Sequence, residues 1–300
     1  MKESINIETK LFKRAGTHDG KFHADEVMAT AILHLLFDIE VVRTRDPKTL
    51  GELEIVYDVG GGKFDHHGIE KRYRESGTPF AACGLIWYEY GREAIHFLEP
   101  SLAKEEIESV FQYVDRALIE GIDAQDNGIR FEETSIPLMN ISIIISGYNP
   151  PWYSDDDEHN AFNKAIPLCI DVLKNTINRR VAVFKSKNIV IQAYKKRDIR
   201  EILVLDRYCL WEEALLKIDE HDEVLFVVFP EKDQYVIQTV KEQDGNIRKN
   251  LPEAWAGREN KELAAITGID GAVFCHSGRF LAIARTFGAV MQMAEQAIQS

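Results

Sequence analysis

Short apolar runs and polar loops alternate in the N-terminal part of the chain. Three runs predict β-strands, each followed by a polar or glycine-rich segment: Leu11–Ala15, Ile39–Arg43 and Glu54–Val59. Apolar residues at helical spacing predict a helix that opens with Asp25 and Glu26 at its positively polarised end. Further helices are predicted at Phe80–Tyr90, Leu102–Ala117 and Ser135–Ser146. Alternating strands and helices indicate an α/β fold, a mainly parallel sheet with flanking helices.

The pattern changes in the second half of the chain. Asn149-Pro150-Pro151 ends the helical run, and an acidic turn at 155–158 opens a long helical segment that reaches about Phe184, which Pro167 should bend or interrupt. Runs rich in Val and Ile then predict strands at Ile189–Tyr194, Ile202–Leu205, Val224–Phe229 and Tyr235–Val240. We therefore predict two domains, residues 1–186 and a smaller α/β domain of residues 187–300, with the active site in the cleft between them.

Composition indicates a soluble globular protein. The 300 residues are 45% apolar and 28% charged, and the longest apolar runs are far shorter than a membrane span. The N-terminus lacks the apolar core of a signal peptide, so we expect a cytoplasmic protein without a membrane partner. The four cysteines form no Cys-x-x-Cys pair, which argues against a zinc knuckle or a disulfide scaffold.

Charge limits how the protein can bind nucleic acid. The formal net charge is −13, whereas a protein that grips long nucleic acid usually has a basic surface. Any contact with a polyanion should therefore be local. Bound divalent cations would supply positive charge and would need surrounding carboxylates to hold them.

The first candidate site lies in the loop before the first predicted helix. Residues 17–26 contain two imidazoles, His18 and His23, and three carboxylates, among them Asp25. A single histidine here would more often cap the helix, but this combination favours a metal site. Imidazole with carboxylate suits Mn²⁺, Fe²⁺ or Zn²⁺ better than Ca²⁺, which prefers oxygen alone.

Two further segments carry chemistry. Asp58 ends a short apolar strand before three glycines and the triplet Asp65-His66-His67. Adjacent histidines project to different sides, so only one of His66 and His67 need bind metal. Asp123 and Asp126 follow a helical run at a spacing that can place both on one side of a turn, although a solvated helix end explains them equally well.

These segments resemble the motifs of the DHH phosphoesterase superfamily, whose signature Asp65-His66-His67 matches. Closer still, the sequence resembles the melanocyte-proliferating-gene-one family of metal-dependent hydrolases, linked to 3′-to-5′ RNA exonuclease activity. The resemblance extends over nearly the whole chain.

The resemblance implies a role for each candidate residue. His18 and His23 would bind one metal ion; Asp25, His66 and Asp126 would bind the second, with Asp123 as the alternative to Asp126; and Asp58 would bridge the two. His67 would contact the phosphate. His276 and Arg279 would bind the substrate, although a surface turn between two strands also explains them. Lys21 is a further candidate to neutralise the substrate. His23 stands where many superfamily members have aspartate, so the metal preference of other branches cannot simply be copied. Mn²⁺ is the expected ion, with Mg²⁺, Fe²⁺ and Zn²⁺ left open.

The leading hypothesis is two-metal hydrolysis of a phosphodiester at the 3′ end of RNA or a short oligonucleotide. The acidic net charge favours an alternative, a small-molecule phosphatase or pyrophosphatase. A third hypothesis is a non-catalytic interaction protein anchored by metal, and a homodimer is left open. We expect Trp152, Trp211 and Trp255 to be core residues rather than stacking platforms for bases.

Overall fold

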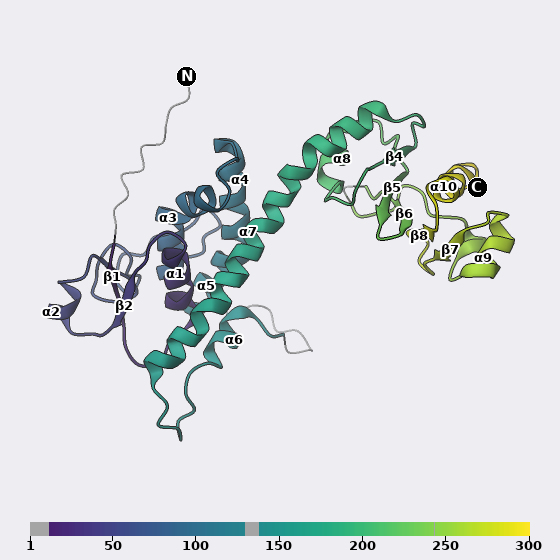
Figure 1. Ribbon diagram of the computed structural model, residues 1–300. Helices are drawn as coiled ribbons and strands as arrows, with labels where there is room; N and C mark the ends of the chain where they lie inside the picture. Colours follow the sequence, from purple (N-terminus) through teal and green to yellow (C-terminus); the bar gives the residue numbers. More distant parts are fainter. Residues whose placement is uncertain (1–11, 130–137, 243) are drawn as a thin grey trace. The chain divides into compact units, whose positions relative to one another are not determined.

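The computed structural model describes residues 12–129, 138–242 and 244–300, which form two compact units (Figure 1). Unit 1 ends at Arg180 and unit 2 begins at Val181, beside a boundary predicted near residue 186. Leu11 and residues 135–137 of the predicted elements lie outside the described residues. The two units are described in turn.

Unit 1 has a small parallel sheet. Its strands are β1 (Arg14–Thr17), β2 (Glu40–Arg43) and β3 (Ile55–Val56), in the order β2-β1-β3. Both neighbours run parallel to β1, so the carboxyl ends of all three strands lie at one edge, where ligands collect in such sheets. The predicted α/β fold with a parallel sheet and flanking helices is confirmed.

Helix α1 (Ala24–His34) follows β1 and packs against α3 (Ala82–Leu98). Its residues from Ala24 to Leu33 are all buried, so α1 is the central helix of the unit. The remaining helical segments are α2 (Pro47–Leu50), α4 (Lys104–Val114), a π-helical turn (Asp115–Ile119), α5 (Glu120–Asp126) and α6 (Ile141–Ser146). The segment from 104 to 126 is thus helical throughout, and Asp123 and Asp126 lie within it.

Helix α7 (Glu158–Lys196) is much longer than predicted. It continues through Pro167, which therefore does not interrupt it. The strand predicted at Ile189–Tyr194 is wrong, because these residues form the last turns of α7. Val190 is buried there, with Ile189 and Ala193 packed around the same cluster, a helical rather than alternating spacing.

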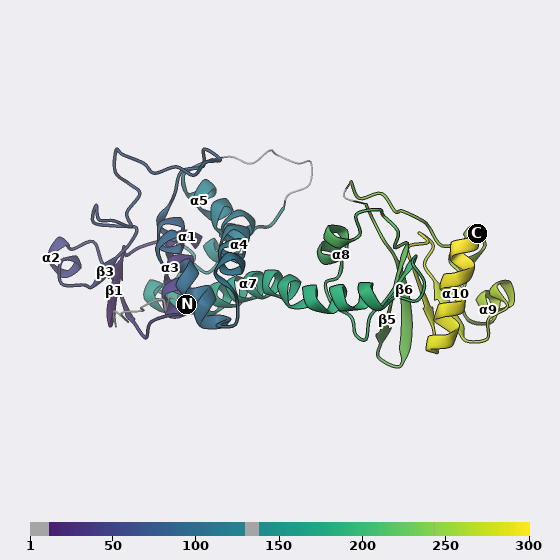
Figure 2. The ribbon, with the colours of Figure 1, turned by 90° about the horizontal axis from the view of Figure 1, so that it is seen from above.

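Unit 2 is a mixed five-stranded sheet in the order β4-β5-β6-β8-β7. The strands are β4 (Ile202–Val204), β5 (Phe226–Glu231), β6 (Gln234–Thr239), β7 (Ala272–Cys275) and β8 (Leu281–Ala284). Only β4 and β5 pair in parallel; the other pairs are antiparallel. The helical segments are α8 (Glu212–Ile218), a 3₁₀ turn (Glu253–Trp255), α9 (Asn260–Thr267) and α10 (Phe287–Gln299). Figure 2 shows α10 lying along this sheet.

The tryptophans divide into two groups. Trp211 and Trp255 are buried in the two apolar clusters of unit 2, as predicted. Trp152 is 91% exposed, so its assignment to the core is wrong. No helix in the described part of the chain is long and apolar enough to cross a membrane.

Candidate metal centre

Strand register brings His18 and Asp58 together. Gly16 of β1 pairs with Val56 of β3, and the chain continues for two residues beyond each at the carboxyl edge of the sheet. His18 Nε2 and Asp58 Oδ2 are 3.3 Å apart there, and both side chains are buried. Two segments forty residues apart in sequence thus meet through ordinary parallel pairing.

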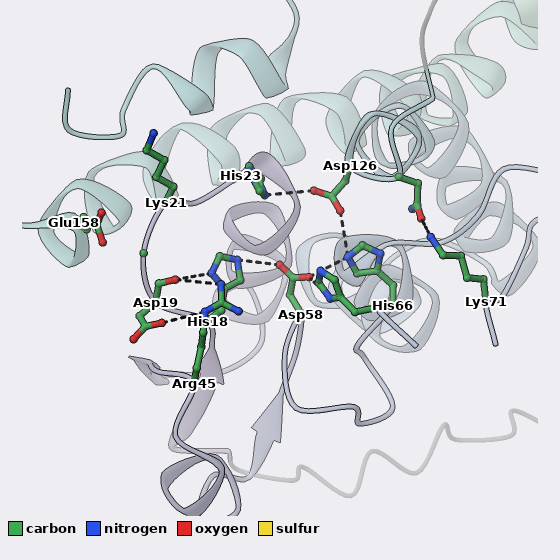
Figure 3. Close-up of a pocket in the computed structure, with 13 residues that line it drawn as sticks. His18, Asp19, Lys21, His23, Arg45, Asp58, His66, Lys71, Asp126 and Glu158 are labelled. Atoms are coloured by element: carbon green, nitrogen blue, oxygen red, sulfur yellow. Dashed lines mark hydrogen bonds and ion pairs between the residues drawn. The ribbon is translucent and has the colours of Figure 1, made fainter. Parts of the chain in front are cut away.

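Asp58 lies between two histidines. Its Oδ2 faces His18, and its Oδ1 lies 3.1 Å from Nε2 of His66 (Figure 3). The backbone of Asp58 has φ 60°, a left-handed conformation that is uncommon for a residue with a side chain and often marks a functional site. The N–H of Asp58 donates to the carbonyl of Phe64, which closes the glycine loop and brings His66 back to the strand end.

His18 is oriented by its backbone neighbour. Its Nδ1 lies 2.8 Å from the carbonyl oxygen of Asp19, and because a carbonyl only accepts, Nδ1 carries the proton. Nε2 faces Oδ2 of Asp58 and Oε1 of Glu26, 3.3 and 3.0 Å away, and would offer its lone pair to a metal ion once it has lost its proton. A backbone carbonyl behind the imidazole is the usual arrangement for a histidine that binds metal.

Glu26 belongs to the site, and the sequence hypothesis left it out of the ligands. It is fully buried in the first turn of α1, where its Oε1 also accepts the N–H of His23. Its Oε2 is buried without a hydrogen-bond partner among the described residues. Since Glu26 was already recognised as one of three carboxylates in this loop, its position one residue after Asp25 was the available signal.

His66 and Asp126 form the other side of the centre. Nε2 of His66 is 3.2 Å from Oδ2 of Asp126, and Oδ1 of Asp126 is 3.6 Å from Nδ1 of His23. The donor atoms of Asp25, His66 and Asp126 lie within 4.8 Å of one another, as do those of His18, His23 and Glu26. Two adjacent groups of nitrogen and oxygen donors thus flank Asp58.

Asp25 and Asp123 lie deeper than the other candidates. The carboxylate of Asp25 accepts the N–H groups of Ala82 and Cys83 at the start of α3, at 2.9 and 2.7 Å. Asp123 accepts the N–H of Gly84 and pairs with Arg74 at 2.7 Å. The structure therefore brings Asp126 to the site and directs Asp123 into the interface between α3 and α5.

His67 is exposed and held by Asp65. Nδ1 of His67 donates to Oδ1 of Asp65 at 2.8 Å, and Nδ1 lies 3.7 Å from Oδ1 of Asp58. The other oxygen of Asp65 accepts the N–H of Gly61. Within the Asp65-His66-His67 triplet, Asp65 thus orients His67, His66 is buried beside Asp58, and His67 faces solvent.

An open cavity of about 930 Å³ within unit 1 is lined by six of the candidate side chains: His18, His23, Asp58, His66, His67 and Asp126. Its rim carries the cationic residues Lys21, Arg45 and Lys71. Arg45 pairs with Asp19, and Lys71 donates to Asn127. Lys71 was missed because it lies in a loop whose sequence has no recognisable pattern.

The remaining predicted residues, His276 and Arg279, lie in unit 2. They occupy the turn between β7 and β8, where Nδ1 of His276 accepts the N–H of Gly278. Arg279 has φ 57° and its carbonyl accepts the N–H of Leu251. Their role toward a substrate stays a prediction.

Comparison with known proteins identifies the family of this chain. The sequence profile described as "Uncharacterised protein family (UPF0160)", MYG1_exonuc, matches residues 14–298. The chain belongs to this family. The family resemblance inferred from the motifs is thereby confirmed.

Relatives in this family come from distant organisms. A MYG1 protein of Chlamydia pneumoniae is 33% identical over 282 residues, covering 89% of this chain and 90% of its own. The human protein named MYG1 exonuclease is 28% identical, covering 94% of this chain and 84% of its own. RecJ of Thermus thermophilus, solved with Mn²⁺, aligns over 96% of this chain and 52% of its own at 14% identity and a TM-score of 0.26.

The pKa values of the buried side chains in this site show that its carboxylates favour nearby positive charge. Burial lowers the pKa of His18, but its hydrogen bonds to Asp58 and Glu26 outweigh burial and raise that pKa to about 10. Burial likewise lowers the pKa of His66, which Asp126 and Asp58 raise to about 10. Burial and the charges of Asp58 and Asp126 raise the pKa of Asp25 well above its usual value. His18, His66 and Asp25 thus tend to retain protons when no other cation is near.

The donor set fits divalent ions. Mixed imidazole and carboxylate donors suit Mn²⁺, Fe²⁺ and Zn²⁺, and the buried, unpartnered Oε2 of Glu26 is an oxygen that an ion could satisfy. A metal ion would displace the protons that His18 and His66 hold on Nε2. The proton and the ion therefore compete for the same atoms.

Proposed function

We propose that the chain is a divalent-metal-dependent phosphoesterase that holds two ions on either side of Asp58. His18, His23 and Glu26 would hold one ion, and His66, Asp126 and Asp25 the other. The observation that carries this proposal is that the two oxygens of one buried carboxylate face two different histidines, at 3.3 and 3.1 Å. A carboxylate so placed is suited to bridge two cations.

The chain's own residues would have distinct tasks in the reaction. When bound, a pair of ions lowers the pKa of a water molecule and stabilises the attacking and leaving oxygens of an in-line displacement. Asp58 would set the spacing of the pair. His67, oriented by Asp65, would contact a phosphate oxygen, and Lys21 would neutralise phosphate charge at the rim.

For the substrate, we propose RNA or a short oligonucleotide shortened from its 3′ end. The human relative is named an exonuclease, and a cavity of about 930 Å³ is large enough for a nucleotide. With a net charge of −13, the protein would repel a long polyanion except close to bound cations. Attack at a chain end needs only such a local contact.

The test is hydrolysis of 5′-end-labelled single-stranded RNA with Mn²⁺. We expect a ladder of labelled products that shorten by one nucleotide, with release of nucleoside monophosphates. RNA with a blocked 3′ end should resist, whereas RNA with a blocked 5′ end should not. Absence of products with Mn²⁺, Mg²⁺, Fe²⁺ and Zn²⁺ would overturn the proposal, and shortening from the 5′ end would overturn the polarity.

A second candidate function is hydrolysis of a small phosphate ester or pyrophosphate. The acidic charge favours it, because a small substrate avoids repulsion by the protein surface. Both candidates use the same centre, so the products separate them. Release of inorganic phosphate from mononucleotides or pyrophosphate, with intact RNA, would favour the second.

A further inference from the structure

Two large aromatic side chains stand exposed in the segment between α6 and α7. Trp152 is 91% exposed and Tyr153 75%, and their rings make an edge-to-face contact with centroids 5.6 Å apart. Such rings bury a large apolar area when they find a partner. Their exposure side by side leaves two adjacent π-faces for a ligand.

This segment is tied to the metal-site loop at both of its ends. At one end, the side chain of Asn149 accepts the N–H of Phe22 at 2.9 Å and donates to the carbonyl of Phe22 at 2.7 Å. At the other end, Arg43 donates to the carbonyls of Glu158 and of Gly20, at 3.2 and 2.6 Å. Phe22 and Gly20 belong to the loop that carries His18 and His23.

The tethers keep the aromatic pair close to the cavity. Trp152 is three residues from Asn149, so it lies within about 10 Å of that anchor. Glu158, at the far end of the segment, itself lines the cavity. Pro150 and Pro151 restrict the backbone before Trp152 and reduce the entropy lost when a ligand binds.

Charge identifies the part of a ligand that the pair would meet. Asp155, Asp156 and Asp157 follow after one serine and would repel phosphate groups. A nucleobase is uncharged and stacks on an aromatic face whatever its identity. The acidic turn and the aromatic pair together favour contact with bases over contact with a phosphate backbone.

We propose that Trp152 and Tyr153 form a stacking platform for the bases of a single-stranded oligonucleotide whose end occupies the cavity. This inference rests on the proposed function. It adds a source of affinity that does not depend on basic residues, and so reconciles nucleic-acid binding with an acidic protein. It also makes recognition independent of base identity but dependent on the presence of a base.

Binding of a fluorescein-labelled oligouridine, measured by anisotropy, tests the platform separately from turnover. Stacking contributes about 1–3 kcal/mol per base, so Trp152→Ala should weaken binding by about 5- to 150-fold. Trp152→Phe keeps a π-face and should recover most of the affinity. Phe97→Ala removes another exposed aromatic residue of unit 1, 64% exposed at the end of α3, and should bind as the wild type does.

Two further measurements distinguish stacking from other roles. The loss in Trp152→Ala should be confined to oligonucleotides with bases and absent for a chain of abasic nucleotides of the same length. Oligonucleotide binding should also quench tryptophan fluorescence in the wild type but not in Trp152→Phe, because Trp87, Trp211 and Trp255 are buried.

The outcomes separate this inference from the proposed function. Hydrolysis of RNA with equal oligonucleotide affinity in the wild type and Trp152→Ala would overturn the platform alone, and would assign the exposed pair to a protein partner instead. Binding that depends on Trp152, without hydrolysis under any metal, would support the platform and overturn the function. Absence of both binding and hydrolysis would overturn both.

Discussion

Unit 1 contains two acidic clusters that are neutralised in different ways. In the deeper one, Asp123 is paired with Arg74, a permanent cation, and with the N–H of Gly84. In the cavity, the ion-pair partners of Asp58 and Asp126 among the described residues are all histidines. The deeper cluster is therefore neutralised by an arginine of the protein itself. The carboxylates of the cavity depend instead on a cation that can be exchanged.

A glycine of α3 explains why Asp123 lies in the deeper cluster rather than in the cavity. Gly84 has no side chain, and a Cβ there would collide with Asp123, so the carboxylate can approach the helix closely only because of the glycine. Arg74, largely buried, then closes the cluster from the other side. Asp126, one turn further along α5, points into the cavity instead. One helix thus supplies a carboxylate to each cluster.

The largest effect is expected from Asp58→Ala. Because this side chain faces both donor groups, its loss should lower turnover by about three orders of magnitude, equivalent to several kcal/mol of transition-state stabilisation. Calorimetric titration with Mn²⁺ should show weaker and fewer sites, while circular dichroism stays that of the wild type. Retained turnover would refute the bridging role, and unfolding would indicate a structural role instead.

Arg74→Ala should affect stability rather than metal binding. It leaves the fully buried Asp123 without its cation, which should cost about 3–5 kcal/mol in the free energy of unfolding. Denaturant titration measures this. Arg116→Ala, which breaks an exposed pair with Glu120, is the matched control and should cost less than about 1 kcal/mol. Equal effects of the two variants would refute the contrast between the clusters.

Asp65→Asn should have an intermediate effect on activity. Loss of the carboxylate behind His67 should lower turnover by about 10- to 100-fold, the usual consequence of removing an orienting partner. Metal content, measured by mass spectrometry, should stay at the wild-type level. A simultaneous loss of metal would show that Asp65 supports the ions rather than His67.

The last prediction concerns pH. In the metal-free protein, the pKa values of His18 and His66 are raised to about 10 from 6.5, so the stability they contribute is present below pH 6.5 and is lost as the pH rises through 10. The raised pKa of Asp25 acts in the same direction. Thermal unfolding in EDTA should therefore occur at lower temperature at pH 9 than at pH 6.5. Mn²⁺ should reduce that decline, and a Tm that rises with pH in EDTA would contradict the account.

Short motifs predicted which side chains come together better than they predicted the helices. Parallel pairing of two strands followed from their apolar patterns, so the meeting of His18 and Asp58 could be expected before the structure. The choice between Asp123 and Asp126 could not be made, because it depends on Gly84 and Arg74, which belong to other segments. Glu26 was missed although it adjoins a predicted ligand.

Tertiary packing explains the errors in secondary structure. The run Ile189–Tyr194 is rich in β-branched residues, yet it extends α7 because Val190 and its neighbours pack against the core of unit 2. Burial of Phe162, Cys169 and Leu173 along the same helix favours its continuation past Pro167. Trp152 was assigned to the core by residue type alone, without evidence of a helix or strand to bury it.

The most direct test is a crystal structure of the protein with Mn²⁺, recorded at a wavelength where manganese scatters anomalously. We predict two anomalous peaks, roughly 3.5–4 Å apart, one on each side of Asp58. A single peak, or peaks that do not contact Asp58, would contradict a bridged two-ion centre.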